Sequence, residues 1–459
     1  MTLDKHLQLP GTTGRPRPAV RRRRGTVLAG ISLGYFMVLL DTTVLSVAEP
    51  DLAASLHTSV AGLQWAANSY TVVFAALLLS AGALADRLGA HRVFRTGAAL
   101  FAVGSALCAL APTVGALIGM RALLGAAAAA CVPSSLALIG RLYPDRVQHA
   151  RAVAAWAAIS GAAVATGPLA GGALVGAAGW RAVFLINVPL GAAVLVLTAT
   201  RSLHCPRGDR RLDWPAQLAA CACLALVTDG LIAAGAAAWP HTAAALGGAA
   251  VTGAAFARLE RRSTAPVLNR ELLGAGAARA GLAAGAAVNF ALAGSLFVLP
   301  LLFTDRGMSA LETGLAFLPL TVPFAVNPPL TGRIVARKGP RPPVLGGLVL
   351  LAVGCCVLAV AVWARAPYGW SAAGLLLTGL GVSFALPALV TAVAGAAPPG
   401  AGGSVGGMLN AARQTGASLG IAVMGAPLAA GTDSAPWAFA VAAVVCAGAA
   451  AWFGGAQRR

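Results

Sequence analysis

The sequence predicts an all-α integral membrane protein, and its composition, its apolar runs and its small residues support that prediction. Of the 459 residues, 58% are hydrophobic and 10% are charged, with a mean hydropathy of +0.79. Soluble domains carry about 25% charged residues. Apolar runs of about 18–25 residues recur, long enough for a helix to cross ~30 Å of hydrocarbon. The 56 glycines favour close helix packing in lipid, and the strict alternation of a membrane barrel is absent.

The apolar pattern predicts fourteen transmembrane helices. Charged segments at 201–212 and 258–279 flank one apolar block, 213–257, that is long enough for a helical hairpin. Four prolines predict that the tenth span is heavily kinked, because proline removes a backbone hydrogen bond; they are Pro319, Pro323, Pro328 and Pro329. The predicted spans are 27–48, 62–83, 93–111, 114–137, 151–175, 181–200, 213–235, 240–257, 280–302, 313–332, 342–362, 370–393, 406–430 and 436–455.

These spans divide the chain into two six-helix bundles with an extra central hairpin. The first residues are rich in Pro and Arg, which favours disorder, and the apolar stretch after Arg21–Arg24 is too long for a signal peptide. The expected parts are a disordered basic cytoplasmic N-terminus (1–26), an N-terminal bundle (27–200), a linker with the hairpin (201–279, hairpin 213–257), a C-terminal bundle (280–455) and a cytoplasmic tail (456–459).

The net charge of +19 is distributed unevenly between the two sides of the predicted membrane. With the N-terminus inside, 28 of the 33 Lys and Arg residues fall in cytoplasmic segments or at the cytoplasmic ends of spans, three fall at the outer ends and two fall deep within spans. This asymmetry follows the positive-inside rule and places both termini in the cytoplasm, with the chain in the cytoplasmic membrane. The basic excess is then a topology signal, and we expect no nucleic-acid partner.

Metal and enzyme chemistry find little support in the sequence. Most of the eight cysteines lie in spans without paired metal-ligand spacing, which is typical of small buried hydrophobes. The six histidines fall in tails, loops or span ends, and no Walker motif is present. We therefore expect no metal, no ATP-binding site and no enzyme activity.

The two halves share a sequence echo at a cytoplasmic turn. GALADRLGAHR (82–92) follows the second span, and GRIVARKGPR (332–341) follows the tenth. Both segments alternate glycines with basic residues. Repeated halves are the construction of many secondary transporters, so the echo favours a transporter.

Six segments carry a resemblance to a known family. They are LDTTVLSVAEPDL (40–52), QWAANSYTVVFAALLLSAGALADRLGAHR (64–92), RALLGAAAAACVPSS (121–135), GPLAGG (167–172), GWRAVFLINVPLG (179–191) and GGMLNAARQTGASLGIAVMG (406–425). Over residues 27–455 the chain resembles the major facilitator superfamily, specifically its fourteen-span drug:proton antiporters. Within that group it looks most like actinomycete antibiotic-resistance exporters of the methylenomycin A type.

The resemblance implies the major facilitator fold and proton-coupled efflux of a small lipophilic drug or antibiotic by alternating access. It implies no cofactor beyond the proton gradient. The implied partners are the lipophilic substrate, protons and the lipid bilayer, and the implied state is a monomer. Three other functions stay open from the residues: a facilitator or exporter of a non-drug metabolite, a polytopic membrane enzyme, and a non-transporting sensor or scaffold.

Three residues depart from the family pattern. Glu49 stands where the family usually has an aliphatic residue, and Leu124 replaces a usual Gln in the fourth-span motif. Ala336 occupies the acidic position in the second copy of the loop. Because Ala336 has no charge, we expect the first copy of the loop alone to supply the acid for an ionic contact that locks the two halves together.

Asp41 and Arg121 are the candidates for proton coupling. Asp41 lies deep in the first span, where a carboxylate costs roughly 2.5–3.5 kcal/mol on insertion scales and normally has a partner or a task. Arg121 lies in the fourth span and stays charged, so it must be paired or solvated. The resemblance makes Arg121 the residue that tunes the carboxylate. The alternatives are a purely structural pair, or an Arg121 that reaches the outer headgroups.

Two glycine-containing motifs are expected to control conformation. The loop residues can form a lock, because Asp86 can accept hydrogen bonds from a helix N-terminus across the two halves; the alternative is a solvated turn. The fifth-span residues are linked by the resemblance to export direction and sealing, with ordinary small-residue packing as the alternative. The loop set is Gly82, Asp86, Arg87, Gly89 and Arg92, and the fifth-span set is Gly161, Gly167, Pro168, Gly171 and Gly172.

The remaining polar residues in spans are candidates for a substrate cavity or for secondary proton traffic. Those of the second and thirteenth spans are equally consistent with helix packing. Of the two further acids, Glu49 is expected at the membrane–water boundary, and Asp229 can be structural in the extra hairpin. The cavity set is Trp65, Asn68, Tyr70, Asn410, Arg413 and Gln414, and the possible secondary acids are Glu49 and Asp229.

Overall fold

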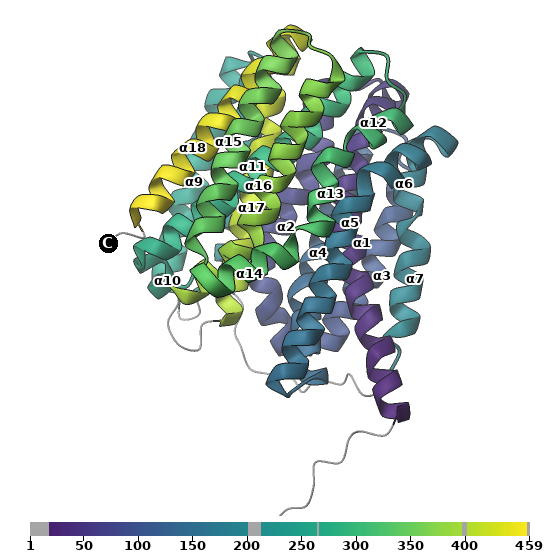
Figure 1. The fold of residues 1–459 in the computed structure, drawn as a ribbon, viewed down its shortest axis with the longest axis vertical. Helices are drawn as coiled ribbons and strands as arrows, with labels where there is room; N and C mark the ends of the chain where they lie inside the picture. Colours follow the sequence, from purple (N-terminus) through teal and green to yellow (C-terminus); the bar gives the residue numbers. More distant parts are fainter. Residues whose placement is uncertain (1–17, 201–212, 264–265, 397–401, 457–459) are drawn as a thin grey trace, which may run out of the picture.

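The computed structural model describes residues 18–200, 213–263, 266–396 and 402–456, and within these ranges the chain is helical without strands (Figure 1). Predicted features that lie outside the described residues are the N-terminal segment up to residue 17, the loop with Arg201, Arg207, Arg210 and Arg211, and the tail from residue 457. The first half contains α1 (Pro18–Leu56), α2 (Val60–Leu88), α3 (Ala90–Ala109), α4 (Val114–Leu142), α5 (Arg146–Ala178), α6 (Arg181–Leu185) and α7 (Asn187–Leu197).

The second half follows an extra pair of helices. α8 (Trp214–Gly235) and α9 (Trp239–Arg262) form a hairpin, and the short α10 (Arg270–Gly274) leads into the next bundle. That bundle contains α11 (Gly276–Asp305), α12 (Ala310–Ala316), α13 (Leu318–Val326), α14 (Pro328–Lys338), α15 (Arg341–Trp363), α16 (Tyr368–Gly395), α17 (Gly402–Gly425) and α18 (Ala435–Ala456), with the 3-10 turns η2 (Ala426–Ala430) and η3 (Thr432–Ser434) before α18.

Several helices begin or end at residues that cap them. The side chains of Ser59, Thr113 and Asp145 accept hydrogen bonds from backbone amides in the first turns of α2, α4 and α5. Gly89 ends α2 with a φ of 93°, and Gly339 ends α14 with a φ of 77°. Glycine adopts this left-handed region readily, so the sequence echo corresponds to the same turn in each half.

Ten of the described helices are long and apolar enough to cross a membrane, or up to eleven if α2, bent by 60° near residue 79, is counted as one span. The sixth predicted span is divided at Ile186, because Pro189 cannot bond to the carbonyl one turn earlier. The tenth is divided into α12, α13 and α14, where Pro319 and Pro328 begin new helices. With α17, which is more polar, these helices are consistent with fourteen spans.

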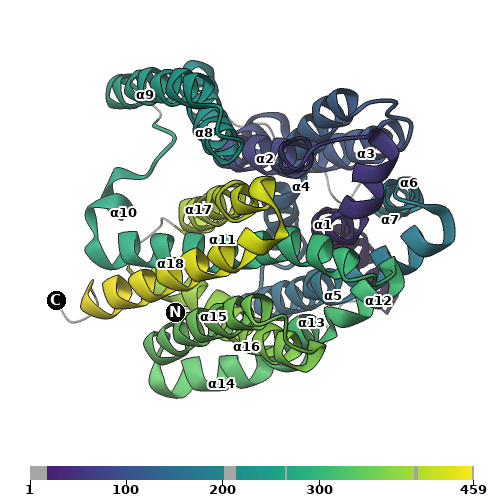
Figure 2. The same ribbon diagram turned by 90° about the horizontal axis from the view of Figure 1, so that it is seen from above.

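Helix packing repeats between the two halves. The first helix packs on the fifth in each bundle (α1 on α5, α11 on α17), and the third packs on the fourth (α3 on α4, α15 on α16). Across the halves, α2 packs on α17, and α5 packs on α12 and α13. Seen from above, the first bundle and the second bundle lie side by side with α11 and α17 toward the first (Figure 2). These crossings join the two halves.

The helices run between two ends of the molecule (Figure 1). The basic end holds the turns at Gly89, 143–145 and Gly339, and the neutral end holds those at 57–59, 110–113 and 306–309. At the basic end Arg95 Nη1 donates to the carbonyl of Leu195 at 2.9 Å. At the neutral end Asp51 Oδ2 accepts from the backbone N–H of Trp180 at 2.7 Å. Because α1 begins at Pro18, residues 18–26 are helical, whereas we expected them without structure.

The extra hairpin lies outside both bundles and is attached through α8 (Figure 2). Gln217 of α8 donates through Nε2 to the carbonyl of Ala76 and accepts from the hydroxyl of Ser80. Ala76 and Ser80 lie on the two sides of the bend in α2, so Gln217 contacts both arms of this helix. Farther along α8, Thr228 and Ser418 of α17 share a hydrogen bond of 3.1 Å. The hairpin therefore contacts both α2 and α17, the two helices that pack against each other across the halves.

Candidate functional site

The centre of the first bundle holds a buried polar network around Asp41. Arg121 Nη1, from α4, donates to Asp41 Oδ2, and Asn187 Nδ2, at the start of α7, donates to Asp41 Oδ1 at 3.0 Å. Asp41 and Arg121 are each 2% exposed. The structure thus brings together the two residues predicted to act as a pair. Asn187 was not predicted, although an Asn inside the apolar segment 182–199 was a signal for it.

Arg121 is held from three further directions. Its Nε donates to the carbonyl of Ala66 at 3.1 Å, and its guanidinium lies 4.6 Å from the ring centroid of Tyr70. The ring of Phe184 lies on another side, with a centroid distance of 6.0 Å. Arg121 therefore does not extend to the headgroups, and α1, α2, α4, α6 and α7 all contribute to the network. A guanidinium over aromatic faces retains part of the stabilisation that it loses with water.

Glu49 differs from its predicted place. We expected the first span to end at residue 48, with Glu49 at the membrane–water boundary. Instead α1 continues to Leu56, and Glu49 is 4% exposed. Its Oε2 atom has no hydrogen-bond partner among the described residues, and Arg121 is the cation that acts on it electrostatically. Glu49 is therefore a second buried acid near the same arginine.

The glycines of α5 form contacts that larger residues would block. A Cβ at Gly171 would lie 2.7 Å from the carbonyl of Val44, and one at Gly167 would collide with Thr43, both on α1. A Cβ at Gly172 would lie 2.5 Å from the carbonyl of Ala310, on α12 of the other half. The same holds from the other side of this contact, because a Cβ added at Gly314 of α12 would lie 2.5 Å from the carbonyl of Pro168. This part of α5 therefore joins the halves at the neutral end, whereas Gly161 has no such neighbour.

The loop signature lies at the basic end. Gly89 forms the turn between α2 and α3, and Asp86, Arg87 and Arg92 are exposed. Gly82 lies on α2 beyond its bend, with open space beside it. The five predicted lock residues therefore sit together on one short stretch, at the end of the molecule opposite the contact between α5 and α12.

The six residues predicted to line a cavity do not form a single cluster. Tyr70 belongs to the Arg121 network, and its hydroxyl donates to the carbonyl of Val38 at 3.4 Å. Asn68 is completely buried, and neither atom of its amide has a partner among the described residues. Trp65 is half-buried. One turn before Asn68, Gln64 donates to the carbonyls of Ile421 and Ala422 at 2.9 Å each, so this face of α2 faces α17.

The thirteenth-span residues form their own network. Arg413 donates through Nη1 to Asn410 Oδ1 at 3.1 Å and through Nε to Asn289 Oδ1, on α11, at 3.2 Å. Gln414 is half-buried beside them. Sequence reasoning missed Asn289, although a polar residue in the middle of the ninth predicted span was the available signal.

Asp229 lies in the extra hairpin. Its Oδ2 is 2.7 Å from His241 Nε2, so the residue joins α8 to α9. Both side chains are partly exposed, at 26% and 59%. This contact favours the structural interpretation of Asp229 over a part in coupling, because the Asp41 network lies in another bundle.

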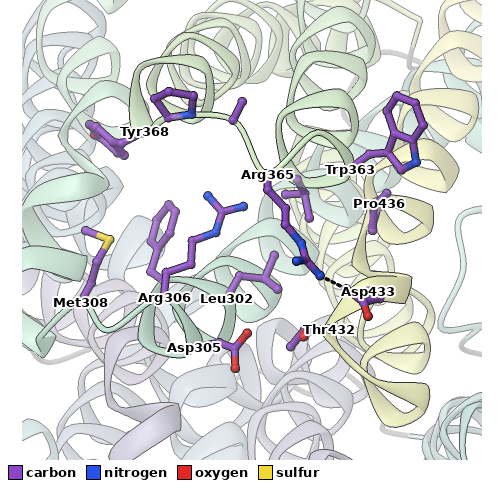
Figure 3. A pocket seen from close by; sticks show the side chains of 14 residues that line it. Leu302, Asp305, Arg306, Met308, Trp363, Arg365, Tyr368, Thr432, Asp433 and Pro436 are labelled. Atoms are coloured by element: carbon purple, nitrogen blue, oxygen red, sulfur yellow. Dashed lines mark hydrogen bonds and ion pairs between the residues drawn. The ribbon is translucent and has the colours of Figure 1, made fainter.

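A pocket of about 830 Å³ opens at the neutral end of the second half (Figure 3). Arg365 Nη2 pairs with Asp433 Oδ1 at 2.9 Å along one side, and the guanidinium of Arg306 lies between this pair and Tyr368. The pocket contains none of the predicted site residues. It lies within one half, so it is separate from the crossings between the halves.

The chain is similar to known proteins over most of its length. The family model described as Major Facilitator Superfamily matches residues 31–421 and 287–458. The chain is 35% identical over 415 residues to the multidrug resistance protein Stp of Mycobacterium tuberculosis, covering 90% of this chain and 77% of the relative. It is 36% identical over 426 residues to the methylenomycin A resistance protein of Streptomyces coelicolor, covering 91% and 89%.

A solved structure shares the fold. A bacterial homolog of the human lysosomal transporter Spinster, in an inward-facing and occupied conformation, superposes with a TM-score of 0.69. The two sequences are 17% identical, and the match covers 95% of this chain and 97% of the other. At that identity the likeness concerns the arrangement of helices alone.

Proposed function

The chain belongs to the major facilitator superfamily, and we propose that it exports small lipophilic drugs or antibiotics in exchange for protons. The observation that carries this proposal is the buried pair of Asp41 and Arg121 in the middle of a multi-pass helical membrane fold. A transporter that couples to protons needs a titrating group shielded from bulk water. The relatives named for multidrug and methylenomycin A resistance support the drug substrate.

The proton cycle follows from the contacts of Asp41. As a carboxylate, Asp41 accepts from Arg121 and Asn187, which together offset the cost of burying its charge. When Asp41 takes up a proton from the outer side, its pairing with Arg121 weakens and the network can rearrange. Release of that proton to the cytoplasm restores the pair. One proton enters for each cycle of this single site.

Alternating access needs a seal at each end in turn. At the neutral end, the close contact of Gly172 with Gly314 and the bonds from Gln64 to α17 hold the halves together. At the basic end, Asp86 would form the lock when that end closes, because a carboxylate is favoured at a helix N-terminus. Breaking one set of contacts while making the other exposes the substrate to one side only.

The orientation is part of the proposal. The charge distribution supports a cytoplasmic position for the basic end and for both termini, in the cytoplasmic membrane. The neutral end then faces outward, and the seal formed by α5 closes the outer side. We further propose that the protein works as a monomer. Both sides of each crossing, α2 on α17 and α5 on α12 and α13, come from the same chain.

The test is a drug-susceptibility panel in an efflux-deficient host that expresses this chain. We expect raised resistance to several lipophilic compounds, lost when a protonophore collapses the proton gradient. Resistance that survives the protonophore would contradict proton coupling. Unchanged susceptibility to every compound, with the protein present in the membrane, would contradict drug efflux.

A further inference from the structure

Arg413 carries a positive charge into the second bundle, and within the part of the chain that the structure describes it forms no ion pair with a carboxylate. Its guanidinium is held by the amide oxygens of Asn289 and Asn410, at 3.2 and 3.1 Å. Its own helix, α17, contains no Asp or Glu. Arg121, the other arginine within a span, is neutralised by Asp41. Arg121 is thus buried and paired with a carboxylate, whereas Arg413 is half-buried and held by neutral amides.

Neutral amides orient a guanidinium but do not cancel its charge. Arginine stays protonated in proteins, so the charge cannot be removed by titration. A guanidinium has five N–H donors, and the two hydrogen bonds of Arg413 leave the others available for a ligand. Arg413 is half-buried, so its charge is only partly solvated, and a ligand with a negative charge would supply the counter-ion.

The first half supplies an aromatic surface toward this arginine. α1, which carries Tyr35, packs on α11, the helix whose Asn289 accepts a hydrogen bond from Arg413. The ring of Tyr35 stacks on Trp156 of α5, with 4.6 Å between centroids and an angle of 10°. The indole Nε1 of Trp156 is buried, with no hydrogen-bond partner among the described residues. Arg413 and these rings therefore come from opposite halves, with α1 and α5 on one side and α11 and α17 on the other.

We propose that the exported compound is a lipophilic monoanion, such as a carboxylate or phenolate, whose charged group binds Arg413. Its apolar body lies against the pair of Tyr35 and Trp156. This inference rests on the proposed efflux function and names its substrate class. It also separates the two charges of the cycle, because the proton binds Asp41 in the first half and the anion binds Arg413 in the second.

Separate sites have a consequence for energetics. Exchange of one outgoing monoanion for one incoming proton moves two positive charges inward, whereas exchange of a neutral compound moves one. The membrane potential therefore drives export of the anion more strongly than export of its neutral analogue.

The experiment uses the full-length protein in liposomes with an imposed proton gradient. The probes are 1-pyrenebutyrate, its methyl ester and the monocation rhodamine 6G, so that charge varies while each probe keeps a flat aromatic body. The variants are Arg413→Gln, Arg413→Lys and the control Arg365→Gln. Arg365 lies in an exposed ion pair at the neutral end, so its variant removes the same charge away from the site.

We expect the wild type and Arg365→Gln to transport the anion best. Arg413→Gln should transport the anion at least tenfold more slowly than the wild type, while its transport of the ester changes less than twofold. Arg413→Lys should transport the anion at an intermediate rate. An equal loss for all three probes would show that Arg413 only holds α11 to α17, and would overturn the inference. Equal wild-type transport of the anion and the ester would also overturn it.

A binding measurement separates this inference from the proposed function. If the wild type transports none of the probes, proton-driven efflux of these compounds is contradicted. Quenching of tryptophan fluorescence by 1-pyrenebutyrate in purified protein then decides the substrate class. Binding at least tenfold tighter to the wild type than to Arg413→Gln supports the anion site, and equal binding overturns it.

Discussion

Asp41 and Arg121, 80 residues apart in the sequence, form an ion pair in which the two side chains are 1% and 2% exposed. Asn187 completes the environment of the carboxylate from a third helix. A buried pair of this kind is costly to break from one side only, because the remaining charge has no water to solvate it. Substitutions at the two positions should therefore have different consequences.

Asp41→Asn should abolish proton release on substrate binding and concentrative efflux. Asparagine preserves the shape of the side chain and removes the titrating group, so protein abundance should stay near normal. The measurement is the pH change of a weakly buffered detergent solution when substrate is added. Glu49→Gln is the matched control, because it removes the neighbouring buried acid. Equal release from the wild type and Asp41→Asn would move the coupling role to Glu49.

Arg121→Ala should destabilise the fold by about 3–5 kcal/mol, because it leaves Asp41 buried without its cation. The measurement is the midpoint of thermal unfolding in detergent. The double variant Asp41→Asn/Arg121→Ala should recover much of this loss, since no buried charge remains. Additive destabilisation in the double variant would show that the two charges do not depend on each other.

Gly172→Ala should impair sealing of the neutral end, because the added Cβ would lie 2.5 Å from the carbonyl of Ala310 across the two halves. We expect a raised proton leak in liposomes without substrate. Gly176→Ala is the control, one turn later on α5, where a Cβ has no neighbour within 4 Å. A leak that is equal in both variants would exclude a specific role for the contact.

Asp86→Asn should insert normally but transport at a small fraction of the wild-type rate. The residue is exposed near the C-terminal end of α2, so the substitution removes a charge without opening the core. The measurement is substrate efflux normalised to the amount of protein in the membrane. Glu271→Gln, an exposed acid on α10, is the control for loss of a surface charge. Full transport by Asp86→Asn would identify the loop as a solvated turn.

The fourteen-span topology predicts the side of three positions. Reporter fusions at His241 and Asp433 should report the outer side, and a fusion at Arg210 should report the cytoplasm. The expected result follows from the positive-inside distribution and from the two apolar helices of the extra hairpin. A cytoplasmic signal at His241 would mean that the hairpin does not cross, which would leave twelve spans.

The sequence by itself determined which segments enter the membrane and where the backbone turns. Transfer of apolar residues from water to lipid is a property of each segment alone, so α3, α4, α8 and α9 could be predicted individually. Gly89 and Gly339 are required locally, because each turn needs a left-handed backbone conformation. The prolines of the tenth span divide its helix whatever its neighbours are, because each proline lacks a backbone N–H. Asp41 and Arg121 stood out because charges are rare within apolar spans.

Only the tertiary structure decided which polar groups meet. Asn187 reaches Asp41, Asn289 reaches Arg413, and Gln217 reaches the bend in α2, in each case from another helix. It also placed Glu49 inside, because α1 continues past the predicted end of the span. Helices in lipid are nearly all apolar around their circumference, so hydropathy does not fix their rotation. Close packing of small residues and hydrogen bonds between helices fix it instead, and these depend on the whole bundle.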